Sequence, residues 1–315
     1  MSAKITIIGA GSVGATIAYN LAQQAFASEI VLIDINKQKA LGEVLDIEQG
    51  SYFRKPIKVT CGEYEDAKDS DIVVITSGIA RKPGQTRLEL VQTNVNIIKS
   101  ITPQIVSVAP KALYIIVSNP IDILTYVFTK ISGLPEKQIL GSGTSLDTAR
   151  LRCVLSKKLN IAQNNIKAFI FGEHGDTSFV PWSTATVEGV PVDDYVEMMK
   201  KMGRPVEDLD KDAIIDEVRK AGGVVIANKG ATFYAICNAV VDLCATLVSA
   251  SESVAAVSSM MHGEYGVDDV CLSCLTIIGP DGVVGKVPMQ MTDEEVALMQ
   301  KSADALKAVI SEIEL

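Results

Sequence analysis

A histidine in a glycine-flanked segment is the side chain best suited to chemistry in this chain of 315 residues. His174 lies in Gly172-Glu173-His174-Gly175-Asp176, directly after an apolar stretch over 166–171 that predicts a strand. Imidazole changes charge near neutral pH, so it can donate or accept a proton during a reaction. A lone histidine is more often structural than catalytic, so this interpretation depends on the nucleotide-binding pattern described below.

Two further segments carry charges suited to an anionic ligand. Asp147 and Arg150 are three positions apart near the start of a predicted helix, so they share one face, and this spacing alone favours an ordinary ion pair. The loop over 77–87 holds Arg81, Lys82 and Arg87 and follows a strand, where open α/β sheets bind ligands. Its glycines and proline would let it close as a lid over an anionic substrate, and the alternative is a solvated basic loop.

The glycine pattern near the N-terminus predicts a dinucleotide site. Gly9, Gly11 and Gly14 follow a strand and open a helix, and Asp34 ends the next strand. The three glycines would allow a tight turn, close approach of a pyrophosphate and close helix–strand packing. Asp34 would accept hydrogen bonds from ribose hydroxyls and repel a 2′-phosphate. The pattern therefore favours NAD over NADP.

The elements that must position these residues change character along the chain. The first half alternates apolar strands with helices, which predicts a Rossmann-type, doubly wound parallel sheet. The expected strands are 5–8, 29–34, 57–61, 72–77 and 113–117, and the expected helices are 12–26, 37–50, 88–108 and 120–131.

The second half predicts an α+β arrangement. Helices are expected from about 147, over 206–220, over 224–248 and over 292–313, with strands at 167–171, 254–261 and 271–287. Thr292 and Glu295 have the spacing of a capping box. We expect an NAD-binding domain over 1–143 and an α+β substrate-binding domain over 144–315, tightly joined with a cleft between them.

Composition excludes several classes of protein. Lys and Arg number 29 against 38 Asp and Glu, a formal net charge of −9, which disfavours nucleic acid as a ligand. Hydrophobic residues make up 48% of the chain, but charges interrupt the apolar stretch over 240–256, so no membrane anchor is expected. Glycines and polar residues within the first apolar run also argue against a secretory signal.

The cysteines predict neither a disulfide framework nor a metal site. There are 6 cysteines in the whole chain, and Cys271 and Cys274 form a lone pair with no second pair to complete a zinc site. We expect reduced thiols in a cytoplasmic protein, with no bound metal.

Six motifs in this order and spacing resemble the lactate/malate dehydrogenase family over nearly the whole chain, from Lys4 to Ile313. They are GAGSVG at 9–14, Asp34, RKPGQTR at 81–87, SNPID at 118–122, GSGTSLDTAR at 141–150 and GEHGD at 172–176. The resemblance implies a hydride transfer between NAD and a 2-hydroxy acid.

The resemblance also implies a role for each matching residue. His174 would donate or accept the proton and Asp147 would orient its imidazole. Arg150 would bind the substrate carboxylate, Arg87 would polarise the carbonyl, and Asn119 would hydrogen-bond the substrate. Positions that resemble the family's NAD site are Gly9, Gly11, Val13, Gly14, Asp34, Lys39, Tyr64, Gly78, Ser100, Ser118, Asn119 and Ser142.

The residues that would select the substrate disagree with one another. Arg81 resembles the arginine of the malate branch, where it would pair with the second carboxylate of oxaloacetate, whereas an unpaired guanidinium would be costly beside the methyl group of pyruvate. The stretch over 88–92, Thr232, and the stretches over 175–178 and 181–183 resemble the lactate branch. We expect pyruvate and L-lactate as the substrate pair, with oxaloacetate and L-malate as the alternative.

Regulation and assembly are further expectations from the resemblance. Arg152 and Lys167 match positions that bind fructose 1,6-bisphosphate in bacterial lactate enzymes, although Lys167 replaces the usual histidine; the alternative is two ordinary surface cations. Family members are usually homotetramers and sometimes dimers.

Two other classes of function stay open from the sequence. A non-catalytic NAD-binding module would have no need for His174, Asp147, Arg150 and Arg87 together. An NAD- and metal-dependent glycosidase would need a Cys/His metal cluster, which these spacings do not supply.

Overall fold

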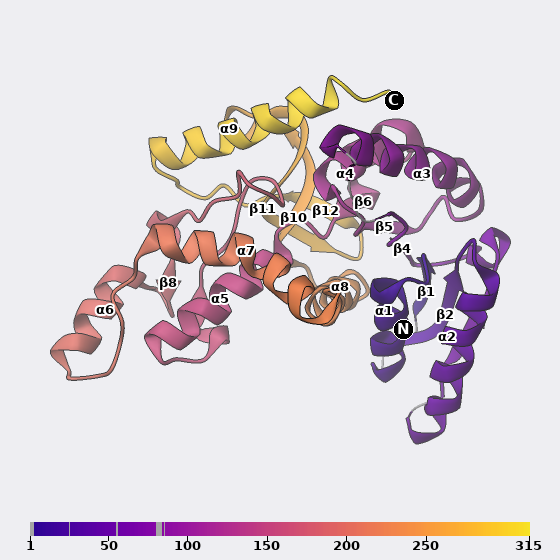
Figure 1. The fold of residues 1–315 in the computed structure, drawn as a ribbon, viewed down its shortest axis with the longest axis horizontal. Helices are drawn as coiled ribbons and strands as arrows, with labels where there is room; N and C mark the ends of the chain where they lie inside the picture. The colour runs from indigo at the N-terminus through magenta and orange to yellow at the C-terminus, as the bar shows by residue number, and fades with distance from the viewer. Residues whose placement is uncertain (1–2, 25, 55, 80–83, 85) are drawn as a thin grey trace.

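The computed structural model describes residues 3–24, 26–54, 56–79, 84 and 86–315. The first half alternates strands and helices as expected (Figure 1). Its elements are β1 (Ala3–Ile8), α1 (Ser12–Gln23), β2 (Ala27–Ile33), α2 (Lys37–Gly50), β3 (Lys58–Cys61), β4 (Ile72–Ile75), α3 (Arg87–Val108), β5 (Leu113–Ile116), α4 (Ile121–Ser132) and β6 (Ile139–Gly141).

The second half contains longer helices and an antiparallel group of strands. Its elements are α5 (Ser145–Leu159), β7 (Ile166–Lys167), β8 (Thr186–Val187), β9 (Val190–Pro191), α6 (Val192–Lys201), α7 (Lys211–Lys229), α8 (Tyr234–Leu247), β10 (Ser253–His262), β11 (Asp268–Gly279), β12 (Gly282–Lys286) and α9 (Asp293–Ile310).

One large sheet passes through both halves. Within the described residues it has the strand order β12-β11-β10-β6-β5-β4-β1-β2-β3. The six strands from β6 to β3 are parallel, and β10 joins β6 in antiparallel orientation through Ser258 and Gly141. The sheet therefore continues across residue 143, where we expect one domain to end and the next to begin.

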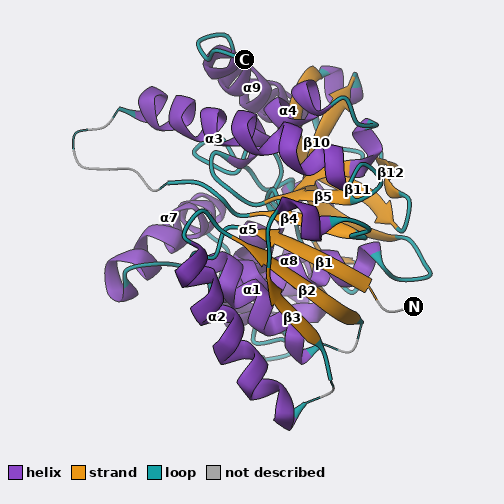
Figure 2. Ribbon diagram, turned by 90° about the vertical axis from the view of Figure 1, so that its right-hand side faces the viewer, coloured by secondary structure: helices purple, strands orange, loops and turns teal. Residues whose placement is uncertain are grey.

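Helices cover both faces of this sheet (Figure 2). Val73 and Ile75 of β4 pack in one core with α3, α4 and α9, whereas Ile72 and Val74 pack in another core with α1, α2 and α8. All four of these side chains are fully buried. Alternate residues of a strand point to opposite faces, so a strand covered on both sides must be apolar throughout.

The region from α5 to α7 forms a third core beside the sheet. Leu151 and Leu155 of α5 pack there with Val187 of β8, Val196 of α6 and Val218 of α7.

At the other end of the chain the predicted capping box is confirmed, because Thr292 and Glu295 exchange side-chain and backbone hydrogen bonds at the start of α9.

The single long helix expected over 224–248 is wrong. Helix α7 continues to Lys229, and α8 begins only at Tyr234. Gly230 ends α7 with a φ of +83°, a left-handed conformation that glycine adopts without strain. The apolar periodicity on both sides hides this break, which contains Thr232.

The strands of the second half also differ from expectation. Strand β7 covers only Ile166–Lys167, so a single residue of the strand expected at 167–171 has regular pairing, although Phe171 forms an isolated bridge with Phe179. The stretch over 271–287 belongs to two strands, β11 and β12, which are joined by a turn at residues 280–281, and β12 begins at Gly282 with a φ of +88°. The short strands β6, β8 and β9 were not predicted, because two or three residues carry too little periodicity. Helix α6, with ten residues, was also not predicted.

Candidate active site

The glycine-rich turn after β1 has the shape that a dinucleotide requires. Gly9 has a φ of +111°, and a methyl group on Gly14 would lie 1.8 Å from the Gly9 carbonyl oxygen, so packing demands glycine at both positions. A methyl group on Gly11 would meet nothing within 4 Å. Gly11 also has an ordinary φ of −71°. Neither packing nor backbone strain therefore accounts for Gly11, which fits the close approach of a ligand.

Asp34 secures the same turn from the end of β2. One carboxylate oxygen accepts a hydrogen bond from the Ala10 N–H at 2.6 Å, and the other accepts one from the Asn36 N–H at 2.8 Å. A carboxylate has about four lone-pair sites, so Asp34 retains acceptor capacity for ribose hydroxyls.

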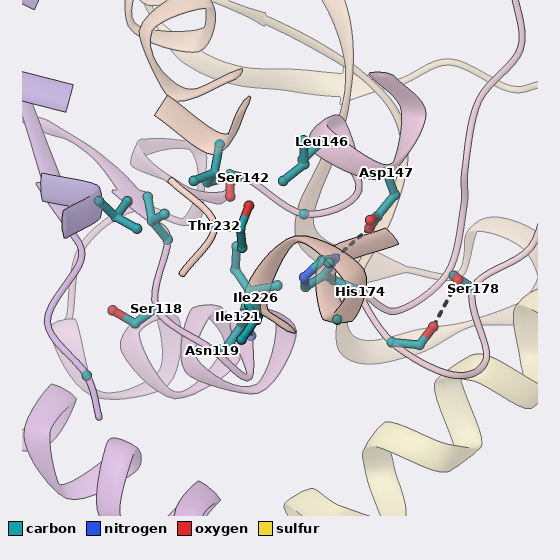
Figure 3. A pocket seen from close by; sticks show the side chains of 18 of the residues that line it. Ser118, Asn119, Ile121, Ser142, Leu146, Asp147, His174, Ser178, Ile226 and Thr232 are labelled. Atoms are coloured by element: carbon teal, nitrogen blue, oxygen red, sulfur yellow. Dashed lines mark hydrogen bonds and ion pairs between the residues drawn. The ribbon is translucent and has the colours of Figure 1, made fainter. Parts of the chain in front are cut away.

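A cavity of about 450 Å³ is lined by residues at the carboxyl ends of the parallel strands and by residues of α5 and α7. Figure 3 shows side chains that line it. Ser118 and Asn119 enter it from the end of β5, and Thr232 enters from the break between α7 and α8. Predicted residues from both halves meet in its lining, which includes Val13, Gly78, Ser118, Asn119, Ser142, Asp147, Arg150, His174 and Thr232.

His174 and Asp147 form a close pair in this cavity. His174 Nδ1 lies 2.5 Å from Asp147 Oδ2, and Arg150 Nη1 donates to Asp147 Oδ1 at 2.9 Å. The side chains are 26%, 9% and 16% exposed for His174, Asp147 and Arg150, so the group is partly shielded from water. The Asp147–Arg150 pair is therefore not the ordinary surface ion pair that its spacing alone favoured.

The contact with Asp147 favours the charged form of His174. Burial by itself lowers the pKa of His174, but the charge and hydrogen bond of Asp147 outweigh it, and the pKa lies above the ordinary 6.5. For Asp147, burial raises the pKa, yet His174 and then Arg150 hold it below its usual value. His174 can therefore carry a proton at neutral pH, with Nε2 left for a ligand.

Ser142 supplies an independent sign of a ligand. Its hydroxyl group is buried in the cavity lining and has no hydrogen-bond partner within the part of the chain that the structure describes. An unsatisfied buried hydroxyl is costly, so it fits a polar ligand group that completes its bonding. With the turn at 9–14, this fits a bound dinucleotide.

Other predicted nucleotide-binding residues lie outside the cavity lining. Lys39 is exposed in the first turn of α2, and Tyr64 packs, half-buried, against the core on the α3 side of the sheet. The Ser100 hydroxyl donates to the Ile97 carbonyl within α3.

Only part of the charged loop over 77–87 lies within the described residues. Arg81 lies outside the described residues. The backbone of Arg87 begins α3, where Thr86 and Glu89 form a capping box that fixes the start of the helix.

The two predicted effector residues lie apart from this cavity. Arg152 Nε donates to the Ala168 carbonyl, and its guanidinium stacks 4.8 Å from the centre of the Phe169 ring. Arg152 also lines a second cavity of about 440 Å³, whereas Lys167 is exposed and donates to the Asn164 carbonyl.

Several residues that build the site escaped the sequence interpretation. The buried Asn94 on α3 exchanges hydrogen bonds with the Ile79 backbone and donates to the Asn119 carbonyl at 2.8 Å. Arg219 and Gly222 of α7 complete the wall opposite Arg150. The buried Asp122 accepts a hydrogen bond from the His174 backbone N–H at 2.7 Å. Asp122 alone carried a signal, as the one acid in the apolar stretch over 121–128.

Neither a metal-binding cluster nor a membrane-spanning helix occurs among the described residues. No group of three or more His, Cys, Asp or Glu side chains there could hold a metal ion. No helix there is long and apolar enough to cross a membrane.

The glycine-rich turn and the His174–Asp147 pair share one cavity, because Val13 of that turn and both residues of the pair line it. This combination defines a nucleotide-dependent oxidoreductase. Family comparison agrees: residues 3–141 match a model described as "lactate/malate dehydrogenase, NAD binding domain", and residues 144–314 match "lactate/malate dehydrogenase, alpha/beta C-terminal domain". The chain belongs to the lactate/malate dehydrogenase family, and its cofactor is NAD.

Named relatives and solved structures are similar over nearly the full length. An L-lactate dehydrogenase of Thermoanaerobacter sp. (strain X514) is 45% identical, covering 99% of both chains, and one of Acetivibrio thermocellus is 42% identical, covering 99% of this chain and 98% of its own. The ligand-bound minor L-lactate dehydrogenase of Enterococcus mundtii has a TM-score of 0.94 at 36% identity, covering 100% and 99%. Malate dehydrogenase of Archaeoglobus fulgidus in complex with NADH has a TM-score of 0.86 at 32% identity, covering 98% and 99%.

Proposed function

We propose that this NAD-dependent oxidoreductase catalyses the reversible reduction of pyruvate to L-lactate. The observation that carries the proposal is the contact between His174 Nδ1 and Asp147 in the cavity that also contains Arg150. The named L-lactate dehydrogenases at 40–45% identity support pyruvate as the substrate.

NAD supplies the hydride chemistry when bound, with Gly9, Gly11, Gly14 and Asp34 as the residues that would hold it. The protein must supply the proton. Because Nδ1 of His174 contacts Asp147, Nε2 is the nitrogen that gives a proton to the substrate oxygen during reduction and takes it back during oxidation. Asp147 favours the imidazolium and fixes the orientation of the ring.

Substrate binding is assigned to the arginines and polar residues of the cavity. Arg150 binds the substrate carboxylate, and the glycine wall of α7 leaves room for it, because a methyl group on Gly222 would lie 3.3 Å from Arg150 Nη2. Asn119 and Thr232 add hydrogen bonds, and Arg87 polarises the carbonyl group.

Reduction of oxaloacetate to L-malate is the second candidate, and Arg81 is the observation that favours it. A guanidinium in a closed site would pair with the second carboxylate of oxaloacetate and would stay unpaired beside the methyl group of pyruvate.

The discriminating experiment compares kcat/KM for pyruvate and oxaloacetate with NADH under identical conditions. We expect pyruvate to be preferred; a clear preference for oxaloacetate would overturn the assignment. Absence of NADH oxidation with any 2-oxo acid would favour a non-catalytic NAD-binding module.

We further propose a cytoplasmic homotetramer, or a dimer, that responds to fructose 1,6-bisphosphate through Arg152 and Lys167. The free state of all six cysteines, every one in the described part of the chain, is consistent with a reducing compartment. The half-buried Arg152 beside a cavity supports an anion site. Sedimentation measures the oligomeric state, and pyruvate kinetics measure the response, each with and without fructose 1,6-bisphosphate. If the bisphosphate changes neither the oligomeric state nor the kinetics, it is not an effector of this enzyme.

A further inference from the structure

Asp122 is a buried carboxylate that the reaction described above does not use. It lies in the first turn of α4 and is 3% exposed. One oxygen accepts the His174 backbone N–H at 2.7 Å, and the other accepts the Ser258 hydroxyl of β10 at 2.6 Å. Asp122 thus connects the strand–helix half of the molecule to the histidine turn and to the antiparallel strands.

A charge at this position is costly, and the contacts alone do not require it. Burial raises the pKa of Asp122 to about 6, although the Ser258 and His174 hydrogen bonds oppose that rise. The structure shows no ion pair to Asp122 among the described residues. An asparagine could satisfy both neighbours, since its oxygen can accept the His174 N–H and its amide can donate to the serine. The carboxylate therefore needs a reason beyond hydrogen bonding.

That reason lies in the charge environment of His174. The described charged and titratable groups that face it or its turn are Asp147 and Arg150 on α5, Glu173 and Asp176 in its own turn, Arg219 on α7, and Asp122 on α4. Asp147 contacts the ring, whereas Asp122 contacts the backbone of the same residue. Two carboxylates from different helices therefore hold one histidine at two points.

We propose that Asp122 is a positioning residue for His174, which fixes the backbone of the histidine turn and supplies a second negative charge that favours the protonated imidazole. This inference rests on the proposed function, in which protonated His174 is the acid for carbonyl reduction. An opposite charge nearby favours a charged group, so loss of the Asp122 charge destabilises the imidazolium.

The variant that tests the charge is Asp122→Asn, which keeps the shape and both hydrogen bonds. In the wild-type profile, kcat/KM for carbonyl reduction declines above a certain pH. In Asp122→Asn we expect this decline to begin about one pH unit lower. The rate above that point then drops about tenfold while the rate at low pH and the affinity for NADH stay close to those of the unmodified enzyme. Ser258→Ala is the matched control, because it removes one hydrogen bond but leaves the carboxyl group in place. At pH values high enough to keep Asp122 ionised, it should move the alkaline decline much less than Asp122→Asn does. An unmoved decline in Asp122→Asn, or an equal loss at every pH, would overturn the proposal.

A titration without substrate separates this inference from the proposed function. The chain has 2 histidines, so His262→Gln leaves one imidazole signal in NMR spectra. That signal should titrate in two steps, one for His174 itself and one near pH 6 as Asp122 is protonated. A single step would contradict the proposal even if Asp122→Asn failed to fold. Two steps in a protein that fails to reduce pyruvate would instead refute the proposed function.

Discussion

The glycine-rich turn at 9–14 and the histidine turn at 172–176 serve one cavity but are held in different ways. Packing and backbone conformation dominate in the first, because Gly14 lies against the Gly9 carbonyl and Gly9 has a positive φ, and Asp34 adds one hydrogen bond from the Ala10 N–H. Charges and hydrogen bonds from distant elements define the second, because His174 depends on Asp147, 27 positions earlier, and on Asp122, 52 positions earlier. A substitution in one turn should therefore impair nucleotide binding or proton transfer without impairing the other.

The largest separation is expected for His174→Gln. Loss of the proton donor should lower kcat/KM for pyruvate by about 10³-fold, within the usual range for general acid–base catalysis. The Kd of NADH, measured by fluorescence, should stay within about twofold, because the nucleotide turn is untouched. A comparable loss of NADH affinity would show that the two turns are not independent.

Asp147→Asn should be the next most damaging change, at about 10²-fold in kcat/KM. In the proposed reaction pyruvate reduction uses protonated His174, so the rate should decline as pH rises through the raised pKa of that histidine. Lactate oxidation uses the neutral form and rises through the same pKa. Without the Asp147 charge the pKa of His174 falls, and both transitions move to lower pH. Steady-state pH profiles in both directions check this, and unmoved transitions would refute the role of Asp147.

Arg150→Lys tests substrate binding on the histidine side of the comparison. A lysine keeps the charge but not the planar fork, and loss of a charge-assisted hydrogen bond of roughly 1.5–3 kcal/mol predicts a fall of about 10- to 100-fold in kcat/KM. The KM for pyruvate should rise while the NADH affinity is retained. Equal kinetics for the lysine variant would mean that Arg150 does not bind the carboxylate with two hydrogen bonds.

Two glycine variants test the nucleotide turn. A methyl group at position 11 enters open space, so Gly11→Ala should fold normally and weaken NADH binding about tenfold, with kcat at saturating NADH preserved. Gly14→Ala is the matched contrast, because its methyl group collides with the Gly9 carbonyl and should lower Tm. Thermal unfolding measures the effect on stability, and NADH titration measures the effect on binding. Unchanged NADH affinity in Gly11→Ala would show that the nucleotide does not approach Gly11 closely.

The smallest effect is expected for Gly222→Ala. Alanine is favoured over glycine in a helix by about 1 kcal/mol, so Tm should rise slightly. Its methyl group would lie 3.3 Å from Arg150 Nη2 and should raise the KM for pyruvate about twofold to fivefold. Calorimetry and steady-state kinetics measure the two effects. A higher Tm with no change in KM would show that the space beside Gly222 does not control how Arg150 binds the substrate.

The same contrast explains what the sequence could predict. The glycine turn and the α9 capping box are contiguous patterns, so their spacing predicts them directly. Pairing of His174 with Asp147 came only from the family resemblance, because spacing says nothing about residues far apart in the chain. Asp122 lies in the SNPID motif at 118–122, but the motif does not reveal its contact with the His174 backbone, and Asn94 lies outside all six motifs. Gly230 was too weak a signal to reveal the break before Thr232 within a continuous helical pattern.

The most direct test is a single-turnover measurement of NADH oxidation by pyruvate across pH, comparing the unmodified enzyme with His174→Gln. The unmodified enzyme should be fast at low pH and slow down as the His174 proton is lost. The variant should be slow at every pH, with no titration. A variant that keeps the original rate, or an unmodified enzyme with a flat profile, would contradict proton transfer by the His174–Asp147 pair.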